Sequence, residues 1–303
     1  MTDVDWAAGA AWMKGEVMPI SEAAIPVTDW GLTHSDITYD VVHVWDGRFF
    51  RMDDYLDRFH QSIKKCRLSV EQSKDEMRAI LHRIVAQSGL QRSYVSMVAS
   101  RGQPTEAGSR DPRYCNNHFY AWCVPFVWVF KEDVVQRGAH VMVPETTSRI
   151  APDAVDPTAK NYHWGDFTQG LFEAKEKGFD NTVLLDHEGH VTEGPGFNLF
   201  MVKDGVVSTA RSGVLQGITR KVAMEICHHH TIPVSETDIT LEQLLEADEV
   251  FATTTGGGPV AITRINARTF SNNAPGEMTR RLSQTYWDWH NDPSMSEAVD
   301  GTL

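Results

Sequence analysis

The 303-residue sequence contains no uninterrupted apolar run of about 18 residues, which excludes an ordinary transmembrane helix. Its first 14 residues lack a basic segment followed by an apolar one, so no secretory signal is expected there. Positive charge is scarce, because 28 lysines and arginines face 41 aspartates and glutamates, giving a formal net charge of −13. This balance argues against non-specific binding of nucleic acid, which depends on a positive field.

Paired cysteines are also missing, because the four cysteines are scattered and form no Cys-x-x-Cys motif. The sequence therefore indicates neither a zinc ribbon nor a redox dithiol, and reduced thiols in a cytoplasmic protein are expected. Three consecutive histidines, His228 to His230, could suggest metal binding. Consecutive helical residues point about 100° apart, so this run predicts a solvated helix end and no metal site.

Hydrophobic residues make up 41% of the chain and charged residues 23%, which is typical of a globular protein. The length suffices for one large domain or two modest ones. Polar residues after Asn291 are expected to form a loose tail. Hydrophobic periodicity predicts strands at 39–45, 48–51, 93–100, 119–129, 139–143, 182–185, 199–202, 206–208 and 249–253, and helices at 53–66, 74–88, 164–177, 219–228, 241–246 and 276–290.

This order of strands and helices predicts an α/β chain in two parts. We expect a small N-terminal α/β domain at residues 1–123, a linker at 124–135 and a larger C-terminal domain at 136–303. The residues with distinctive chemistry lie in the second half.

Lys160 stands in the segment Asp156 to Asp166, between a loop that contains proline and a predicted helix. A lysine that loses part of its solvation in packed structure becomes a nucleophile toward carbonyl groups. Taken alone, however, Lys160 is equally well explained as a solvated surface lysine.

Three glycine-rich segments follow Lys160. In the first, Glu193 precedes a turn that lets the backbone approach a ligand closely. The second, 215–220, opens a helix, and a helix N-terminus with the hydroxyl of Thr219 can hold a phosphate. The third, 253–258, offers three threonines and three glycines but lacks the lysine of a P-loop. Each segment alone is equally typical of a surface turn.

The ordered combination of these segments, with Arg58 upstream, resembles the class-IV aminotransferases. That family includes branched-chain and D-amino-acid aminotransferases, aminodeoxychorismate lyases and (R)-selective amine transaminases. The resemblance extends over residues 10–290. It implies the fold type IV of pyridoxal 5′-phosphate (PLP) enzymes, whose larger domain binds PLP and has a β-barrel-like core.

The resemblance also implies a role for each residue. Lys160 carries PLP through a Schiff base and moves the proton between the substrate carbon and the cofactor. Glu193 pairs with the pyridine nitrogen, so that the ring can accept electrons. The phosphate is held by Arg58, whose planar fork suits it, and by the residues Gly217, Ile218, Thr219, Thr254 and Thr255.

Within the family, the segments 34–41 and 160–166 look most like those of (R)-selective amine transaminases. These enzymes transfer an amino group from a chiral primary amine to a 2-oxo acid, usually pyruvate, by a ping-pong mechanism. By resemblance, the substrate pocket is lined by Tyr39, Val41, Tyr94 and Trp164. The same four side chains are equally consistent with ordinary core packing.

One segment departs from that group, which often carries an arginine for the acceptor carboxylate in the loop after Arg101-Gly102. Ala107 stands where this arginine is expected, and Arg110 or Arg113 is the candidate to replace it. A buried carboxylate without such a charge is costly. Pro195 stands where relatives often have a small residue.

The expected function is therefore a PLP-dependent transaminase that acts on a primary amine and a 2-oxo acid, with no metal. Three alternatives remain open: a branched-chain or D-amino-acid aminotransferase, a lyase acting on aminodeoxychorismate, and a PLP-binding protein without turnover. The resemblance also implies a homodimer with active sites at the subunit interface. No nucleic acid or membrane partner is expected.

Overall fold

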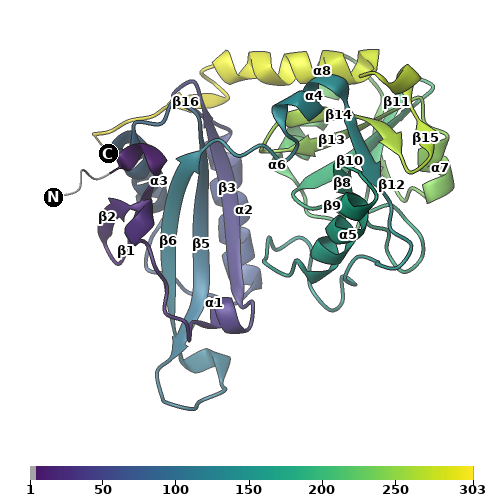
Figure 1. The fold of residues 1–303 in the computed structure, drawn as a ribbon. Coiled ribbons are helices and arrows are strands. Elements are labelled where there is room, and N and C mark those ends of the chain that lie inside the picture. The colour runs from purple at the N-terminus through teal and green to yellow at the C-terminus, as the bar shows by residue number, and fades with distance from the viewer. Residues whose placement is uncertain (1–4, 303) are drawn as a thin grey trace. The chain divides into compact units, whose positions relative to one another are not determined.

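The computed structural model describes residues 5–302, which form two compact units (Figure 1). Unit 1 contains the described residues of Met1–Val127, Ala159–Tyr162 and Asp292–Leu303, and unit 2 contains Trp128–Thr158 and His163–Asn291. The first change of unit, after Val127, falls inside the expected linker 124–135. The sequence assigned 159–162 and the last residues to the C-terminal domain, whereas in the structure they belong to unit 1.

Unit 1 is built on a seven-stranded antiparallel sheet with the order β16-β4-β3-β5-β6-β1-β2. Helix α2 packs on β3, and helix α3 packs on β1, β5 and β6. The elements of unit 1 are η1 (Trp6–Ala8), β1 (Ala10–Met13), β2 (Glu16–Pro19), η2 (Ile20–Glu22), α1 (Trp30–Thr33), β3 (Ile37–Trp45), β4 (Arg48–Phe50), α2 (Met52–Lys65), α3 (Lys74–Ser88), β5 (Ser93–Pro104), η3 (Pro112–Tyr114), β6 (Cys115–Pro125) and β16 (Ser296–Ala298).

The two long helices of unit 1 form where the sequence predicts them, and their ends have clear causes. Helix α2 carries acidic residues in its first turn and Lys64 and Lys65 in its last, which complements the helix dipole. Helix α3 begins with a capping box of Ser73 and Glu76 and ends at Gly89. Leu56 and Phe59 of α2 are buried. These ends fix how the helices cover the sheet.

The C-terminal segment differs from expectation. The sequence predicted a loose tail after Asn291, and this was wrong, because Ser296–Ala298 forms strand β16 on the edge of β4. Glu297 of this strand binds Arg78 and His82 of helix α3. Pairing with β4 and burial of Ser296 outweigh the polar character of the segment.

Unit 2 is built on a nine-stranded mixed sheet with the main order β12-β11-β10-β13-β14-β7-β8, to which β9 adds on β10 and β15 on β14. Helices α6 and α8 pack against each other and on β13 and β14. The elements of unit 2 are α4 (Glu132–Arg137), β7 (Ala139–Met142), α5 (Gly165–Glu176), β8 (Asn181–Thr182), β9 (Glu193–Gly194), β10 (Phe197–Lys203), β11 (Val206–Ala210), α6 (Ile218–His229), β12 (Val234–Thr237), α7 (Leu241–Leu245), β13 (Glu249–Thr254), β14 (Gly258–Ile265), β15 (Arg268–Thr269), η4 (Ser271–Asn273), α8 (Glu277–Asp288) and η5 (Trp289–Asn291).

The core of unit 2 lies against its central strands. Buried residues of β7, β10, β13 and β14 meet Phe130 and Leu244 in one apolar cluster. Strand β14 was not predicted from the sequence, because it begins within the run Gly256 to Pro259, which is typical of a turn. Over the part of the chain that the structure describes, no helix is both long and apolar enough to cross a membrane.

Candidate active site

The candidate residues fall on both units, and each set is described on its own unit. On unit 1, the backbone of Lys160 lies along the first half of strand β3. Its carbonyl oxygen accepts hydrogen bonds from Tyr39 N at 3.2 Å and Thr38 Oγ1 at 2.6 Å. Strand β4 pairs only with the end of β3, at Val44 and Trp45, so this stretch of edge remains available to the Lys160 segment. The register of β3 thus fixes where the lysine stands.

The side chain of Lys160 lies over an aromatic ring. Its Nζ is 4.6 Å from the ring centroid of Tyr39, and that ring is 4.3 Å from the ring of Tyr162. The side chain is half-buried. Partial loss of water is what the sequence hypothesis for Lys160 requires.

Around this position lies a group of seven side chains, which we call the tyrosine wall. The predicted pocket residues Tyr39, Val41 and Tyr94 are part of it, so the structure brings them together. Burial raises the pKa of three of its phenols, Tyr94, Tyr120 and Tyr162, so they remain uncharged. The wall consists of Ile37, Tyr39, Val41, Tyr94, Val98, Tyr120 and Tyr162.

Arg58 projects from α2 and binds Asp40 of β3 in a two-pronged ion pair. Its Nε lies 2.8 Å from Asp40 Oδ2, and its Nη2 lies 2.6 Å from Asp40 Oδ1. Burial alone would lower the pKa of Arg58, but the charge and hydrogen bonds of Asp40 more than compensate and raise it. Asp40 thus orients a guanidinium that the sequence assigned to the phosphate.

On unit 2, Glu193 stands where a tight turn brings two strands together. Gly196 at φ +84° allows the turn between β9 and β10, and the register places Asn198 opposite Glu193. Glu193 Oε2 accepts from Leu215 N at 3.0 Å and from Asn198 Nδ2 at 3.4 Å. Its Oε1 accepts from Arg149, through Nη2 at 3.1 Å and Nε at 3.4 Å. The carboxylate is buried and surrounded by donors.

Arg149 is in turn bound to a second carboxylate. Its Nη1 lies 2.6 Å from Asp166 Oδ2 in the first turn of α5, and its guanidinium lies 4.2 Å from the ring centroid of Phe167. Ile150 N donates to the same Asp166 oxygen at 2.8 Å. Asp166, Arg149 and Glu193 therefore form a continuous buried chain of charges.

The start of helix α6 forms a cradle suited to an anion. Gly217 is the N-cap, and Ile218 and Thr219 lie in the first turn. A Cβ on Gly217 would stand 2.2 Å from Asn198 Oδ1, so a larger residue does not fit. The hydroxyl of Thr219 is buried and has no hydrogen-bond partner. An orphaned hydroxyl beside the N–H groups of a helix start fits a bound phosphate, and the buried Glu193 fits a protonated ring nitrogen.

The two threonines predicted from the third glycine-rich segment lie at the end of β13. Thr254 is buried there, and its Oγ1 accepts from Gly256 N at 3.2 Å. Thr255 follows directly and is half-buried. The neighbouring Thr253 carries a buried hydroxyl without a partner, which the sequence did not single out.

Two further predicted residues lie elsewhere. Trp164 is the N-cap of α5 in unit 2, where its ring lies 5.7 Å from that of Phe167. Arg110 is exposed in the loop between β5 and β6, as is Arg113. The guanidinium of Arg113 binds Asp111 and lowers the pKa of that carboxyl to about 2.

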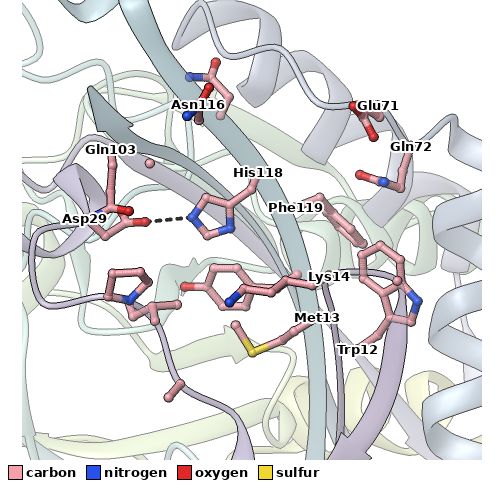
Figure 2. A pocket seen from close by; sticks show the side chains of 17 residues that line it. Trp12, Met13, Lys14, Asp29, Glu71, Gln72, Gln103, Asn116, His118 and Phe119 are labelled. Atoms are coloured by element: carbon pink, nitrogen blue, oxygen red, sulfur yellow. Dashed lines mark hydrogen bonds and ion pairs between the residues drawn. The ribbon is translucent and has the colours of Figure 1, made fainter. Parts of the chain in front are cut away.

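A separate pocket of about 570 Å³ opens on unit 1 (Figure 2). In it His118 Nε2 lies 2.7 Å from the buried carboxylate of Asp29, which also accepts from Ser100 Oγ. None of the residues predicted from the sequence lines this pocket. Tyr120 lines this pocket and also belongs to the tyrosine wall.

Within residues 5–302, no group of three or more His, Cys, Asp or Glu side chains is arranged to hold a metal ion. The three consecutive histidines spread around the end of α6. His229 packs on Trp289, and His230 binds Thr285 at 2.8 Å.

Comparison with known proteins identifies the class. The chain belongs to the class-IV aminotransferases, because the sequence profile of the family Amino-transferase class IV matches residues 38–265. Enzymes of this family use PLP, and solved relatives hold pyridoxamine 5′-phosphate or a phosphopyridoxyl compound. The prediction of a PLP-dependent aminotransferase is confirmed.

Individual relatives agree with this class. The chain is 28% identical over 280 residues to a putative branched-chain-amino-acid aminotransferase of Methanocaldococcus jannaschii, covering 91% of this chain and 95% of the relative. It is 30% identical over 276 residues to a D-alanine aminotransferase of Listeria monocytogenes, covering 88% and 90%. The branched-chain aminotransferase of Thermoproteus uzoniensis superposes with a TM-score of 0.85 at 25% identity, over 96% of this chain and 99% of that one. The predicted fold class is thereby confirmed.

Several residues that contact the candidate site residues of unit 1 or unit 2 were not predicted from the sequence. Asn198 and Asp166 lie inside the segments on which the resemblance is based. The contact of Asn198 with Glu193 depends on the register of β9 and β10, and that of Asp166 depends on where α5 begins. Asp40 lies on a strand that was predicted, but nothing in the sequence indicated that this acidic residue is buried. Arg149 stands in no motif, so only the structure reveals it.

Proposed function

We propose that this aminotransferase moves an amino group from an (R)-configured primary amine to a 2-oxo acid such as pyruvate, by a ping-pong mechanism. The observation that supports this most is the tyrosine wall beside Lys160, whose seven side chains are all uncharged. Its aromatic rings and aliphatic side chains offer apolar surface that an alkyl or aryl group of the donor would bury favourably.

We assign the residues of unit 1 as follows. Lys160 Nζ would hold the cofactor and, once free, would take the proton from the donor carbon. Thr38 and Tyr39 hold the Lys160 backbone, so the side chain swings from a fixed base. Arg58, oriented by Asp40, binds phosphate.

We assign the cofactor-binding residues of unit 2 from the family resemblance. Glu193 accepts a hydrogen bond from the ring nitrogen, and Gly217, Ile218 and Thr219 hold phosphate with Thr254 and Thr255. When bound, PLP supplies an aldehyde carbon that bonds amines and a ring that takes up electrons. Trp164 is proposed to border the substrate.

A second candidate is an aminotransferase for branched-chain or D-amino acids. The likeness to a putative branched-chain-amino-acid aminotransferase and to a D-alanine aminotransferase favours it. Arg110, an exposed arginine in the loop between β5 and β6, offers a cation for an amino-acid carboxylate. The two candidates differ in whether the donor carries a carboxylate.

A donor panel separates these candidates. The purified holoenzyme is given (R)- or (S)-1-phenylethylamine, D-alanine or L-leucine, each with pyruvate or 2-oxoglutarate. We expect the highest kcat/KM with the (R)-amine and pyruvate. Faster turnover of D-alanine or L-leucine than of either amine would instead establish the second candidate.

The Lys160→Ala variant tests the anchor residue. It should lose turnover, together with the covalent link that borohydride reduction traps on the wild-type peptide containing Lys160. The exposed Lys131→Ala serves as control and should retain both. Trapping of the cofactor on another lysine would refute the assignment.

For the molecule as a whole we propose a cytoplasmic homodimer with active sites at the subunit interface, and domains at 1–123 and 136–303. The support is the family resemblance. Sedimentation of the purified protein tests the oligomeric state, and a monomer at micromolar concentration would contradict it.

A further inference from the structure

Arg149 is a buried arginine of unit 2 to which the proposed function gives no role. All three nitrogens of its guanidinium group are engaged by carboxylates. Nε and Nη2 donate to Glu193 Oε1 at 3.4 and 3.1 Å, and Nη1 donates to Asp166 Oδ2 at 2.6 Å. Because carboxylates occupy all three nitrogens, we do not assign Arg149 to phosphate binding as we do Arg58.

The donors around Glu193 determine its charge. Each of its oxygens accepts one hydrogen bond of ordinary length, from Leu215 N at 3.0 Å and from Arg149 Nη2 at 3.1 Å, and one longer bond at 3.4 Å, so acceptor capacity remains for a further donor. A protonated carboxyl group would offer these donors fewer lone pairs and less negative charge. The arrangement therefore stabilises Glu193 as a carboxylate.

The charges of the buried chain do not cancel. Two carboxylates and one guanidinium leave one negative charge in excess, and the side chains of Arg149, Asp166 and Glu193 are only 7%, 12% and 8% exposed. An uncompensated buried charge is strongly unfavourable. A cationic group beside Glu193 would bring the sum to zero, which a protonated ring nitrogen does and a neutral one does not.

We infer that Arg149 is a positioning residue that keeps Glu193 ionised, so that the proton shared by Glu193 and the cofactor ring resides on the ring nitrogen. This inference rests on the proposed assignment of Glu193 to that nitrogen. Only one proton is at stake, held either in an N–H bond of the ring or in an O–H bond of Glu193. Asp166 takes part of the guanidinium charge and thereby limits how far Arg149 neutralises Glu193.

The location of the proton can be measured directly. Wild-type protein and the Arg149→Met variant are reconstituted with PLP labelled with ¹⁵N in the ring, and the ¹⁵N chemical shift is recorded. We expect the shift of a protonated pyridine in the wild type. In the variant it should move toward that of an unprotonated ring, because two buried carboxylates without a cation retain the proton. Turnover per bound cofactor should fall about ten- to a hundredfold, as for the loss of one charged hydrogen bond.

Arg264→Met provides the control. It removes an arginine of the same unit that also lies on a phenylalanine ring, 4.9 Å from Phe179, and it should leave the ¹⁵N shift unchanged. A structural role alone would lower stability in Arg149→Met without moving the resonance.

An unchanged ¹⁵N shift in the Arg149→Met holoenzyme would overturn the inference. If that variant does not fold, the wild type decides the question when its shift is followed from about pH 6 to about pH 9. The ring nitrogen should keep its proton throughout, and loss of the proton near neutral pH would also overturn the inference. Failure of the wild type to bind PLP at Lys160 is a different result, which refutes the proposed function.

Discussion

At the scale of single residues, the hydroxyl of Thr219 connects stability with binding. It is buried at the start of α6 and has no hydrogen-bond partner. Replacing such a group by an apolar one of the same shape removes a desolvation cost of about 1–3 kcal/mol. The same replacement removes a donor for phosphate. Stability and cofactor affinity should therefore change in opposite directions.

We expect Thr219→Val to leave the free energy of unfolding of the cofactor-free protein unchanged or to raise it. The same change should weaken PLP binding about ten- to a hundredfold. Urea unfolding and a PLP titration measure the two quantities. Thr263→Val, at another buried hydroxyl without a partner, is the matched control and should affect only stability. Equal PLP affinity in the two variants would contradict the assignment of Thr219.

The candidate residues themselves could be predicted to a limited extent. Lys160 and Glu193 were predicted as site residues because several segments occur in a recognisable order. Arg149 could not be found, because its importance comes from the carboxylates that the fold brings to it. A buried arginine and an exposed one look alike in a sequence.

At the scale of elements, the loop between β5 and β6 offers the cations closest in sequence to the missing arginine. Arg113 binds Asp111, whereas no ion pair of Arg110 occurs among residues 5–302. Arg110→Ala should therefore raise the KM for pyruvate about tenfold or more, with kcat little changed. Steady-state kinetics with varied pyruvate measure this. Arg113→Ala is the control, and the opposite ranking of the two variants would contradict the prediction.

The ion pairs of strand β16 make the stability of unit 1 depend on pH. Arg78 Nη1 lies 2.5 Å from Glu297 Oε2, and His82 Nε2 lies 3.0 Å from Oε1. Burial would raise the pKa of Glu297, but the bonds and charges of His82 and Arg78 lower it below its ordinary value of 4.5. A lowered carboxyl pKa contributes stability that is present above the unfolded value and lost as the pH falls through the folded one.

Amide hydrogen exchange in β4 and β16 should therefore accelerate as the pH falls from 4.5 downward, beyond the intrinsic change in exchange rate. The Glu297→Gln variant should exchange faster at neutral pH and show a smaller additional change on acidification. Glu16→Gln, at the exposed first residue of β2, is the control for charge alone. Identical exchange in the wild type and Glu297→Gln would show that this ion pair does not hold the strand.

Helices and strands with a clear hydrophobic period were predicted, and elements without one were not. Helices α2 and α3 carry apolar residues at helical spacing and proper ends, so the sequence sufficed. Strand β16 is short and polar, and it forms because β4 offers an edge and α3 offers cations. Partners distant in the chain decide such elements, and local patterns do not contain them.

At the scale of the whole molecule, the class-IV family followed from the sequence. The assignment of segments to units did not, because Ala159–Tyr162 and Asp292–Leu303 join unit 1 after long stretches of unit 2. No change in amino-acid composition marks the points at which the chain returns to unit 1. Hydrogen bonds of Lys160 to β3 and of β16 to β4 determine them.

These returns have a consequence for how the protein is made. The first 127 residues emerge from the ribosome without the segment that lies along β3 and without the strand that covers the edge of β4. The sheet of unit 1 therefore stays incomplete until residues 296–298 have been synthesised, although domains generally fold in order of synthesis. An unpaired strand edge is a template for association with other chains. The edges of β3 and β4 are thus open to such association in the nascent chain until the later segments arrive.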